Sequence, residues 1–182
     1  MKDTLFITPE YVTAKEIKDV RKQLKLTQKE FAALINVSKP TVERWERSKD
    51  KINGPICLLI KMLGKYPEYA EKTKLPKKTA PIRLWYMYGQ TVCTIIDVNE
   101  LKQEVQVTNY AENIMFRAFG AEETPDYQAY QEFLRSRCFP ESRDKMKLIL
   151  RDLDLPFYDP FMIIEKTEGR MAEDDFWIRI ER

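Results

Sequence analysis

The sequence predicts two domains of different class: an all-α domain first, and a small α+β domain after it. Apolar residues recur at helical spacing up to about residue 72 and at alternate positions from residue 82, which is the change expected where helices give way to strands. The segment TKLPKKTAP, residues 73–81, lies between the two patterns and has prolines and lysines without apolar periodicity, as linkers do. We therefore expect domains at residues 1–72 and 82–182, joined by a linker at 73–81.

Charge follows the same division. The chain of 182 residues has a net charge of +2. Residues 1–81 hold 18 basic and 10 acidic residues, a net charge of +8, whereas residues 82–182 hold 13 and 19, a net charge of −6. A basic half is typical of a module that binds a polyanion, and the acidic half indicates a different role.

Composition narrows the possible functions. With 43% hydrophobic and 33% charged residues, the chain has the composition of an ordinary soluble protein. The longest apolar run, residues 55–63, is too short to span a bilayer, and the N-terminus lacks a secretion signal. Cys57, Cys93 and Cys138 are widely spaced, so we expect buried thiols in a reducing cytoplasm rather than disulfides or a zinc site. The chain has no histidine, which removes the commonest general base. We expect a cytoplasmic protein without cofactor, metal site or membrane segment.

Two capping boxes predict helix starts in the N-terminal half. Thr13 is followed by Glu16, and Thr27 by Glu30, which is the spacing at which a side chain and the backbone cap each other. Gln28 is then the first residue of the second helix. Two further helical segments are ICLLIKML and PEYAEK, residues 56–63 and 67–72.

A third helix is predicted between these segments, within VSKPTVERWE. Ser38 is a favourable N-cap, and Pro40 in the first turn removes a donor that would have no partner there. Asn36 precedes it where the chain must turn sharply, and asparagine tolerates the left-handed conformation. Val42 and Trp45 are three residues apart, so we expect both to face the core.

The segment LTQKEFAALINVSKPTVERWERSKDKINGPICLLIKML, residues 26–63, resembles the Cro/repressor (XRE) family of helix-turn-helix proteins, and among them the antitoxin-type regulators. The matching features are Gln28 at the second helix start, Ala32 at the helix crossing, the Asn36-Val37 turn, and the inward Val42 and Trp45. The family prefers glycine where this chain has Asn36, but asparagine reaches the same backbone region. The resemblance implies an all-α helix-turn-helix domain that binds a palindromic double-stranded DNA operator as a homodimer.

The resemblance also makes the third helix the recognition helix. Arginine and lysine read guanine edges in the major groove, so Lys39, Thr41 and Arg44 are expected to reach the bases. Gln28 would donate to a backbone phosphate, and nearby lysines would contact phosphates regardless of sequence. The competing interpretation is that this helix only packs a small bundle and its polar face is solvated. The expected DNA-binding residues are Gln28, Lys29, Ser38, Lys39, Pro40, Thr41, Glu43, Arg44, Arg47, Lys49 and Lys51.

The C-terminal half predicts an antiparallel sheet followed by helices. IRLWYMY and TVCTIIDV flank Gly89-Gln90, a plausible hairpin turn, and EVQVTNY would add a third strand. Helices are expected to start at Thr124-Pro125, within residues 142–153, and at Asp159-Pro160. FLRSRCFPESRDK and FMIIEKTEGR also loosely resemble the small N-terminal subdomain associated with HipA-like kinases, which would imply a partner-binding or inhibitory module without catalysis.

Two clusters in this half could carry chemistry. Glu173, Asp174 and Asp175 could hold Mg²⁺ beside Lys166, but consecutive carboxylates point in different directions, so an acidic surface is the favoured interpretation. In SRCFPESR, Arg137 and Arg143 could lower the pKa of the Cys138 thiol. Without a histidine nearby, we favour a packed cysteine in a turn between helices.

Three functions follow from these patterns. The first is a transcriptional regulator that is the antitoxin of a toxin–antitoxin pair, represses its own operon and binds the toxin through the C-terminal domain. The alternative is a stand-alone repressor, phage-like or metabolic, whose C-terminal domain dimerises or senses a ligand. The third is a carboxylate–metal nuclease targeted by its helix-turn-helix. Only the third is an enzyme, and we expect no catalytic residues.

Overall fold

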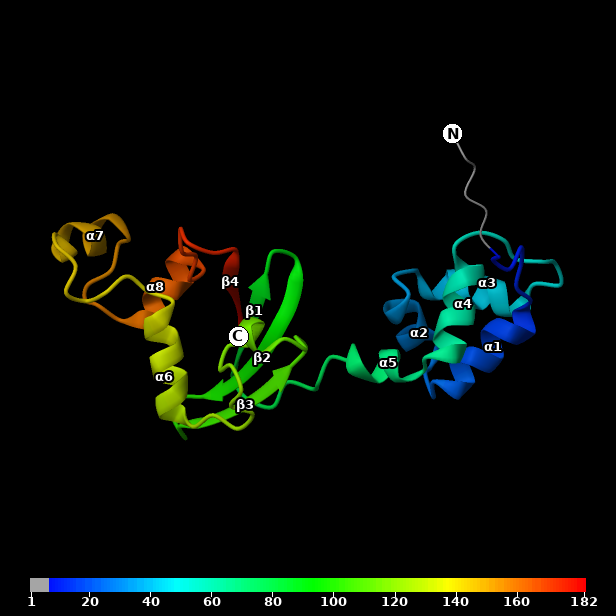
Figure 1. Ribbon diagram of the computed structural model, residues 1–182, viewed down its shortest axis with the longest axis horizontal. Helices are drawn as coiled ribbons and strands as arrows, with labels where there is room; N and C mark the ends of the chain where they lie inside the picture. The colour runs from blue at the N-terminus through cyan, green and yellow to red at the C-terminus, as the bar shows by residue number, and fades with distance from the viewer. Residues whose placement is uncertain (1–6) are drawn as a thin grey trace. The chain divides into compact units, whose positions relative to one another are not determined.

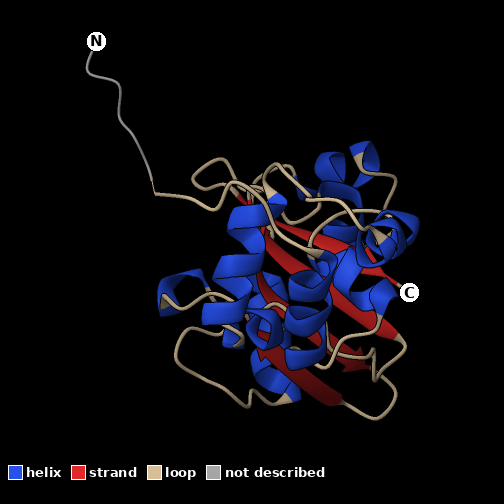
Figure 2. Ribbon diagram, turned by 90° about the vertical axis from the view of Figure 1, so that its right-hand side faces the viewer, coloured by secondary structure: helices blue, strands red, loops and turns tan. Residues whose placement is uncertain are grey.

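The computed structural model describes residues 7–182 and divides into two compact units, one ending at Lys74 and the other spanning Leu75–Arg182. The N-terminal unit is helical, and the C-terminal unit combines a sheet with helices (Figure 1). All named strands, red in Figure 2, belong to the C-terminal unit. The predicted fold class is therefore confirmed, while the linker at 73–81 stays a prediction.

The N-terminal unit contains the helices that the capping residues predict. Thr13 and Thr27 each form a complete capping box with the glutamate three residues later, and Ser38 caps the third helix through the backbone N–H of Thr41. Asn36 adopts the left-handed conformation, with φ of 53°. The helices are α1 (Ala14–Gln23), α2 (Gln28–Leu34), α3 (Lys39–Arg47), α4 (Ile56–Lys65) and α5 (Glu68–Lys72).

The core of this unit collects one apolar face from each helix. Ile17, Phe31 and Val42 are fully buried, and Trp45 packs against them with part of its surface exposed. The segment before α1 is tied to the segment after α3 by a bridge between Val12 and Ile52, whose two N–H···O bonds are 2.9 Å long. The bridge thereby ties together the two ends of the segment that contains α1, α2 and α3.

The C-terminal unit is built on a four-stranded antiparallel sheet. Its strands are β1 (Ile82–Tyr88), β2 (Thr91–Asn99), β3 (Glu104–Asn109) and β4 (Phe176–Glu181), in the order β3-β2-β1-β4. The first three strands confirm the prediction. The fourth was not predicted, although Phe176, Ile178 and Ile180 alternate as a half-buried strand should. The end of the chain thus returns to pair with β1.

Helices cover one face of this sheet. They are α6 (Tyr127–Ser136) and α8 (Pro160–Thr167), and the 3-10 turn η1 (Ile114–Phe116) precedes them. Helix α7 (Met146–Asp152) lies between α6 and α8 in the sequence and has no fully buried residue. Figure 1 shows α6 and α8 beside the strands, and Tyr130 and Ile163 from these helices are fully buried in one core with Leu84, Ile96 and Ile178 of the sheet.

The helix starts in this unit are partly as predicted. Asp159 caps α8 with Pro160 behind it, as expected. For α6 the predicted start at Thr124-Pro125 is wrong by two residues: Asp126 is the N-cap, and its carboxylate accepts from the Ala129 N–H at 2.8 Å. A carboxylate at the N-cap satisfies an orphan N–H donor, and here Asp126 takes the place predicted for the Thr124 hydroxyl. No helix in the described part of the chain is long and apolar enough to cross a membrane.

A buried ion pair anchors the start of the C-terminal unit. Arg83 of β1 donates to both oxygens of Asp97 on β2 at 2.6 and 2.7 Å, and to the Pro76 carbonyl at 3.0 Å. Asp97 also accepts from the backbone N–H and hydroxyl of Thr79. Burial raises the pKa of Asp97, but the bonds from Arg83 and Thr79 outweigh this and hold it below its ordinary value. Part of the predicted linker is therefore bonded to the sheet.

Candidate nucleic-acid interface

Helix α3 turns one face to the core and one face to solvent. Val42 and Glu46 are buried, whereas Lys39, Arg44 and Arg47 are exposed. This separation arises because positions 42, 45 and 46 share one side of a helix with 3.6 residues per turn. The interpretation of Val42 and Trp45 as core residues is confirmed, and three cationic side chains remain on the outer side.

The first turn of α3 is held by its own side chains. The Ser38 hydroxyl accepts from the Thr41 N–H at 3.3 Å and lies 2.8 Å from the Thr41 hydroxyl. Lys39 forms an ion pair of 2.9 Å with Glu43, one turn later, and the hydrogen bond from Lys39 lowers the pKa of Glu43. Thr41 and Glu43 are half-buried rather than fully exposed as expected. Arg44 and Arg47 make no ion pair among residues 7–182, so their guanidinium groups can bind an external anion.

A buried carboxylate fixes α3 against the two preceding helices. Glu46 accepts from the Nε and Nη2 atoms of Arg21 on α1 at 2.6 and 3.1 Å, and from the side-chain amide of Gln28 on α2 at 2.8 Å. Arg21 also donates to the Leu26 carbonyl at 2.9 Å. Glu46 is 7% exposed. Burial raises its pKa, but the bonds from Arg21 and Gln28 lower it more, so the net shift is downward. The network fixes the orientation of α3.

Arg21 and Glu46 are not among the residues predicted from the sequence. The available signal was that Glu46 lies four residues after Val42, on the apolar side of the predicted helix, where a charge requires a partner. The same network bears on Gln28, which was expected to donate to phosphate. It is the first residue of α2, as predicted, but one N–H of its amide is bonded to Glu46. An amide has two N–H donors, so the second N–H remains for a phosphate.

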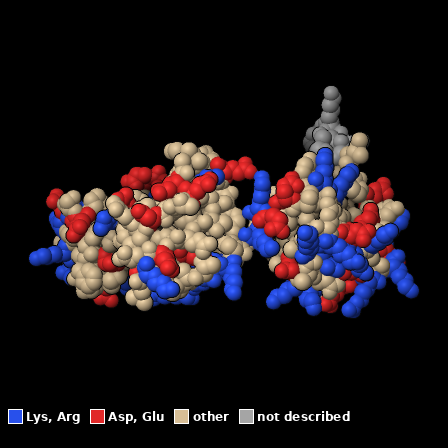
Figure 3. All heavy atoms as spheres, turned by 90° about the horizontal axis from the view of Figure 1, so that it is seen from below, with Lys and Arg blue, Asp and Glu red and all other residues tan. Residues whose placement is uncertain are grey.

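The lysines expected to contact phosphates are on the surface of the same unit. Lys29, Lys49 and Lys51 are exposed, and the Lys51 ammonium lies 3.9 Å from the centre of the Tyr11 ring. In Figure 3 lysine and arginine side chains project from much of the visible surface of the N-terminal unit, on the right. Ser38 and Pro40, also among the expected residues, are exposed at the start of α3. The structure therefore groups the expected residues on one unit, and their contact with DNA stays a prediction.

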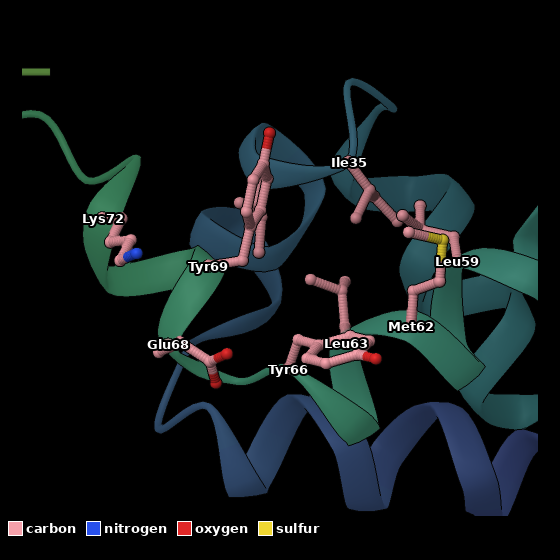
Figure 4. A pocket seen from close by; sticks show the side chains of 9 residues that line it. Ile35, Leu59, Met62, Leu63, Tyr66, Glu68, Tyr69 and Lys72 are labelled. Atoms are coloured by element: carbon pink, nitrogen blue, oxygen red, sulfur yellow. The ribbon is translucent and has the colours of Figure 1, made fainter. Parts of the chain in front are cut away.

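An apolar groove of about 450 Å³ lies elsewhere on the N-terminal unit (Figure 4). In this view Tyr69 of α5 stands across the groove from Ile35 at the end of α2, with Leu63 of α4 between them. Met62 and Tyr69 are 51% and 60% exposed. No residue of α3 lines the groove, so it is separate from the predicted reading surface. Its lining residues are Leu34, Ile35, Leu59, Met62, Leu63, Tyr66, Glu68, Tyr69 and Lys72.

Comparison with known proteins identifies the family that this arrangement of helices matches. Residues 17–60, which include α2, the Asn36 turn and α3, match the family described as helix-turn-helix. The N-terminal unit contains a helix-turn-helix domain. Antitoxin HigA-2 of Vibrio cholerae serotype O1 is 32% identical over 57 residues, which are 31% of this chain and 55% of that protein. The chain thus spans about half the length of the curated relative that it matches. The predicted resemblance to antitoxin-type regulators with a helix-turn-helix is confirmed for this domain.

Beyond the helix-turn-helix domain, the structure accounts for both clusters that could carry chemistry. Asp174 is bonded to Arg137 at 2.7 and 2.9 Å, so the three acidic residues do not converge on one point. Among the described residues no three histidine, cysteine or acidic side chains are placed to hold a metal ion. Cys138 is buried and donates to the Pro160 carbonyl at 3.5 Å. Burial raises the pKa of its thiol to about 12 and outweighs the lowering effect of Arg137, which agrees with the favoured interpretation of a packed cysteine.

Proposed function

We propose that the protein is a sequence-specific DNA-binding transcriptional regulator that acts as the antitoxin of a toxin–antitoxin pair. In this proposal the helix-turn-helix domain binds a palindromic operator and represses the protein's own operon, while the C-terminal unit binds the toxin. The observation that carries the proposal is the outer face of α3 within the matched segment. There Arg44 and Arg47 are exposed and unpaired among the described residues, and the helix is fixed by the Glu46 network.

A fixed helix with free cationic side chains suits readout in the major groove. Arginine pairs with a guanine edge through two parallel hydrogen bonds, which requires a defined orientation of the helix. The hydrogen bonds that Glu46 accepts from Arg21 of α1 and Gln28 of α2 supply that orientation. Lys29, Lys49 and Lys51 would then bind phosphates and add affinity that is independent of sequence.

The toxin-binding part of the proposal is supported by likeness and charge. The relative that matches the helix-turn-helix region is named an antitoxin. Residues 82–182 have a net charge of −6, which complements a basic partner and would speed their association. Co-purification of a basic protein with the full chain from its native cell, and a small toxic protein encoded next to it, would support this part. A chain that isolates alone, without such a neighbour, would favour a stand-alone repressor.

Operator binding is best tested with two substitutions that act differently. Arg44→Ala should weaken binding to the preferred operator by 1–3 kcal/mol while changing binding to unrelated DNA little, because it removes base contacts. Lys49→Ala should weaken binding to all sequences and lower the salt slope by about one, because it removes one phosphate contact. Both are measured by fluorescence anisotropy over a range of salt concentrations.

The matched control is Lys102→Ala, between β2 and β3 of the C-terminal unit. Lys102 is exposed, so its removal changes the net charge as Lys49→Ala does, but outside the helix-turn-helix domain. Equal loss of DNA binding in Lys102→Ala and Lys49→Ala would contradict the assigned surface. Loss of folding stability in Arg44→Ala, without a change in base preference, would contradict the recognition role of α3.

The second candidate, a repressor with a ligand-sensing C-terminal unit, has one specific observation in its favour. A cavity in that unit has arginine side chains among its lining residues, including Arg143 and Arg170. By contrast, one of the three carboxylates that the nuclease hypothesis would use, that of Asp174, is bonded to Arg137.

A further inference from the structure

A cavity of about 330 Å³ lies in the C-terminal unit between two loops that are distant in the sequence. One loop follows α6 and contains the SRCFPESR motif. The other follows α8 and contains the acidic residues that appeared to be a separate cluster. About thirty residues separate the loops along the chain, yet both contribute to one wall. The lining residues are Arg137, Cys138, Phe139, Pro140, Arg143, Ile163, Thr167, Arg170, Met171, Ala172 and Glu173.

Arg137 fixes the two loops to each other. It is 7% exposed, and its guanidinium donates to the Gly169 carbonyl at 3.1 and 2.9 Å, to Asp174 at 2.7 and 2.9 Å, and to the Phe176 carbonyl at 3.0 Å. The same group lies 5.9 Å from the ring centres of both Tyr86 and Phe176. These contacts use most of its donors. Arg137 therefore builds the cavity and is not available to a ligand.

The inner part of the cavity is apolar. Ile163 is fully buried and Phe139 is half-buried, while burial keeps the Cys138 thiol neutral by raising its pKa. The Thr167 hydroxyl is already bonded, because it donates to the Ile163 carbonyl and accepts from the Gly169 N–H. A ligand body placed here would meet carbon and sulfur atoms, which favours an apolar group.

The exposed part of the lining carries two guanidinium groups, those of Arg143 and Arg170, and one carboxylate, that of Glu173. Arg143 is exposed and has no ion pair or side-chain hydrogen bond within residues 7–182. Arg170 pairs with Glu168 at 2.7 Å, but these side chains are 56% and 51% exposed. An ion pair in such contact with water contributes about 1 kcal/mol or less, so an incoming anion can share Arg170. Glu173 is the acidic residue among the lining residues.

We propose that this cavity binds a small organic anion, with its apolar body against Phe139, Ile163 and Met171 and its phosphate or carboxylate between Arg143 and Arg170. Arginine pairs with either head group through two parallel bonds. The volume is at the lower end of the range for small-molecule sites. A nucleic acid fits less well, because residues 82–182 carry a net charge of −6 that repels a polyanion, whereas a single anion responds mainly to the nearest charges.

The test is calorimetric titration of the full chain with four probes: phenyl phosphate, benzoate, inorganic phosphate and benzyl alcohol. Phenyl phosphate, benzoate or both should bind at least tenfold more tightly than inorganic phosphate and benzyl alcohol. Preference between the first two identifies the head group. Equal binding of inorganic phosphate would contradict the apolar body, and equal binding of benzyl alcohol would contradict the anion. Absence of binding by both aromatic anions would overturn the proposal.

Variants locate the site. Arg143→Gln with Arg170→Gln should lower the affinity at least tenfold, and Arg143→Gln alone should lower it by a smaller factor with an unchanged unfolding temperature. The matched control is Arg151→Gln on α7. The Arg151 side chain is 75% exposed, and its Nε atom lies 3.8 Å from the carboxylate of Asp152. An equal effect of Arg151→Gln would mean that net charge alone matters, and the site would be rejected. These titrations contain no DNA, so their outcome is independent of operator binding.

Discussion

At the scale of single residues, Glu46 links the stability of the helix-turn-helix domain to its proposed reading surface. It is one of few buried charges in the N-terminal unit, and its partners come from two other helices. A buried carboxylate without partners would be costly, whereas this one is bonded on both oxygens. The residue that touches no DNA in our proposal therefore decides how Arg44 and Arg47 are presented.

Glu46→Gln should lower the free energy of unfolding of the N-terminal unit by roughly 2–3 kcal/mol at pH 7, because Arg21 loses its charged partner in a mostly buried site. The folded-state pKa of Glu46 lies below its ordinary value of 4.5. Its ionised form therefore stabilises the fold above that value, and the contribution is lost as pH falls through the folded-state pKa. Denaturant unfolding at pH 7 and between pH 5 and pH 2 measures both effects.

The variant should also show a weaker loss of stability in acid than the parent protein, since its side chain no longer titrates. Glu10→Gln before α1 is the control, because Glu10 is exposed and should change stability by less than about 0.5 kcal/mol, as surface substitutions usually do. If both variants behaved alike, the Glu46 network would contribute nothing measurable to the fold.

At the scale of elements, the turn that joins α8 to β4 depends on a glycine. Glu168 and Gly169 both have left-handed backbones, with φ of 55° and 60°. A Cβ at position 169 would lie 3.3 Å from both the Arg137 Cβ and the Ile178 Cδ1. The turn therefore needs the small residue for close packing as well as for its backbone, and it sends the chain back to pair with β1.

Gly169→Ala should destabilise the C-terminal unit by about 2 kcal/mol or more, from the left-handed conformation and the two close contacts together. Gly120→Ala provides the comparison, because Gly120 has φ of 57° but open space around a Cβ, and should cost only about 1 kcal/mol. Thermal unfolding of the two variants gives the difference. Equal destabilisation would show that the Arg137 and Ile178 side chains move aside for the new Cβ with no measurable loss of stability.

Local signals explain which elements the sequence predicts correctly. Thr13, Thr27 and Ser38 are caps that act within one turn, so the starts of α1, α2 and α3 follow from neighbouring residues. The hairpin of β1 and β2 is equally local. By contrast, β4 pairs with a strand some ninety residues earlier, and the acidic residues before it were interpreted as an acidic surface rather than as the approach to a strand. Pattern alone cannot show that Asp174 meets Arg137.

The candidate interface could also be predicted only where its features depend on a single helix. Helical periodicity separates Val42 and Trp45 from the cationic face, because this separation depends on one helix alone. The bond from Gln28 to Glu46 joins two helices and the pairing of Lys39 with Glu43 depends on rotamers, so neither follows from spacing. The arginine-lined cavity could not be predicted from the sequence either, since the two loops that form it meet only in the folded chain.

At the scale of the whole molecule, the apolar groove beside α5 is the surface on which we expect the proposed dimer to form. A helix-turn-helix domain reads one half-site, so a palindromic operator requires two copies related by a two-fold axis. Met62, Tyr66 and Tyr69 leave about half of their surfaces exposed there, and no α3 residue is involved.

Tyr69→Glu should raise the dimer dissociation constant at least tenfold, because it places a charge in an apolar contact. Sedimentation velocity at micromolar concentration measures this, and binding to a palindromic operator should weaken in parallel. Leu101→Glu is the control, since Leu101 is 99% exposed outside this unit and should leave assembly unchanged. A Tyr69→Glu protein that stays dimeric would place the interface elsewhere.

The anchoring of Pro76 and Thr79 on the sheet has a consequence for how such a dimer would behave. Since Arg83 and Asp97 hold these residues, the connection between α5 and the sheet is shorter than the nine residues predicted as linker. Short tethers keep joined modules at millimolar effective concentration. Two copies brought together on an operator would thus present their C-terminal units to one another, or to two partner molecules, far more often than free diffusion allows. Occupancy of the operator would then raise the apparent affinity for a two-fold symmetric partner, without any added contact.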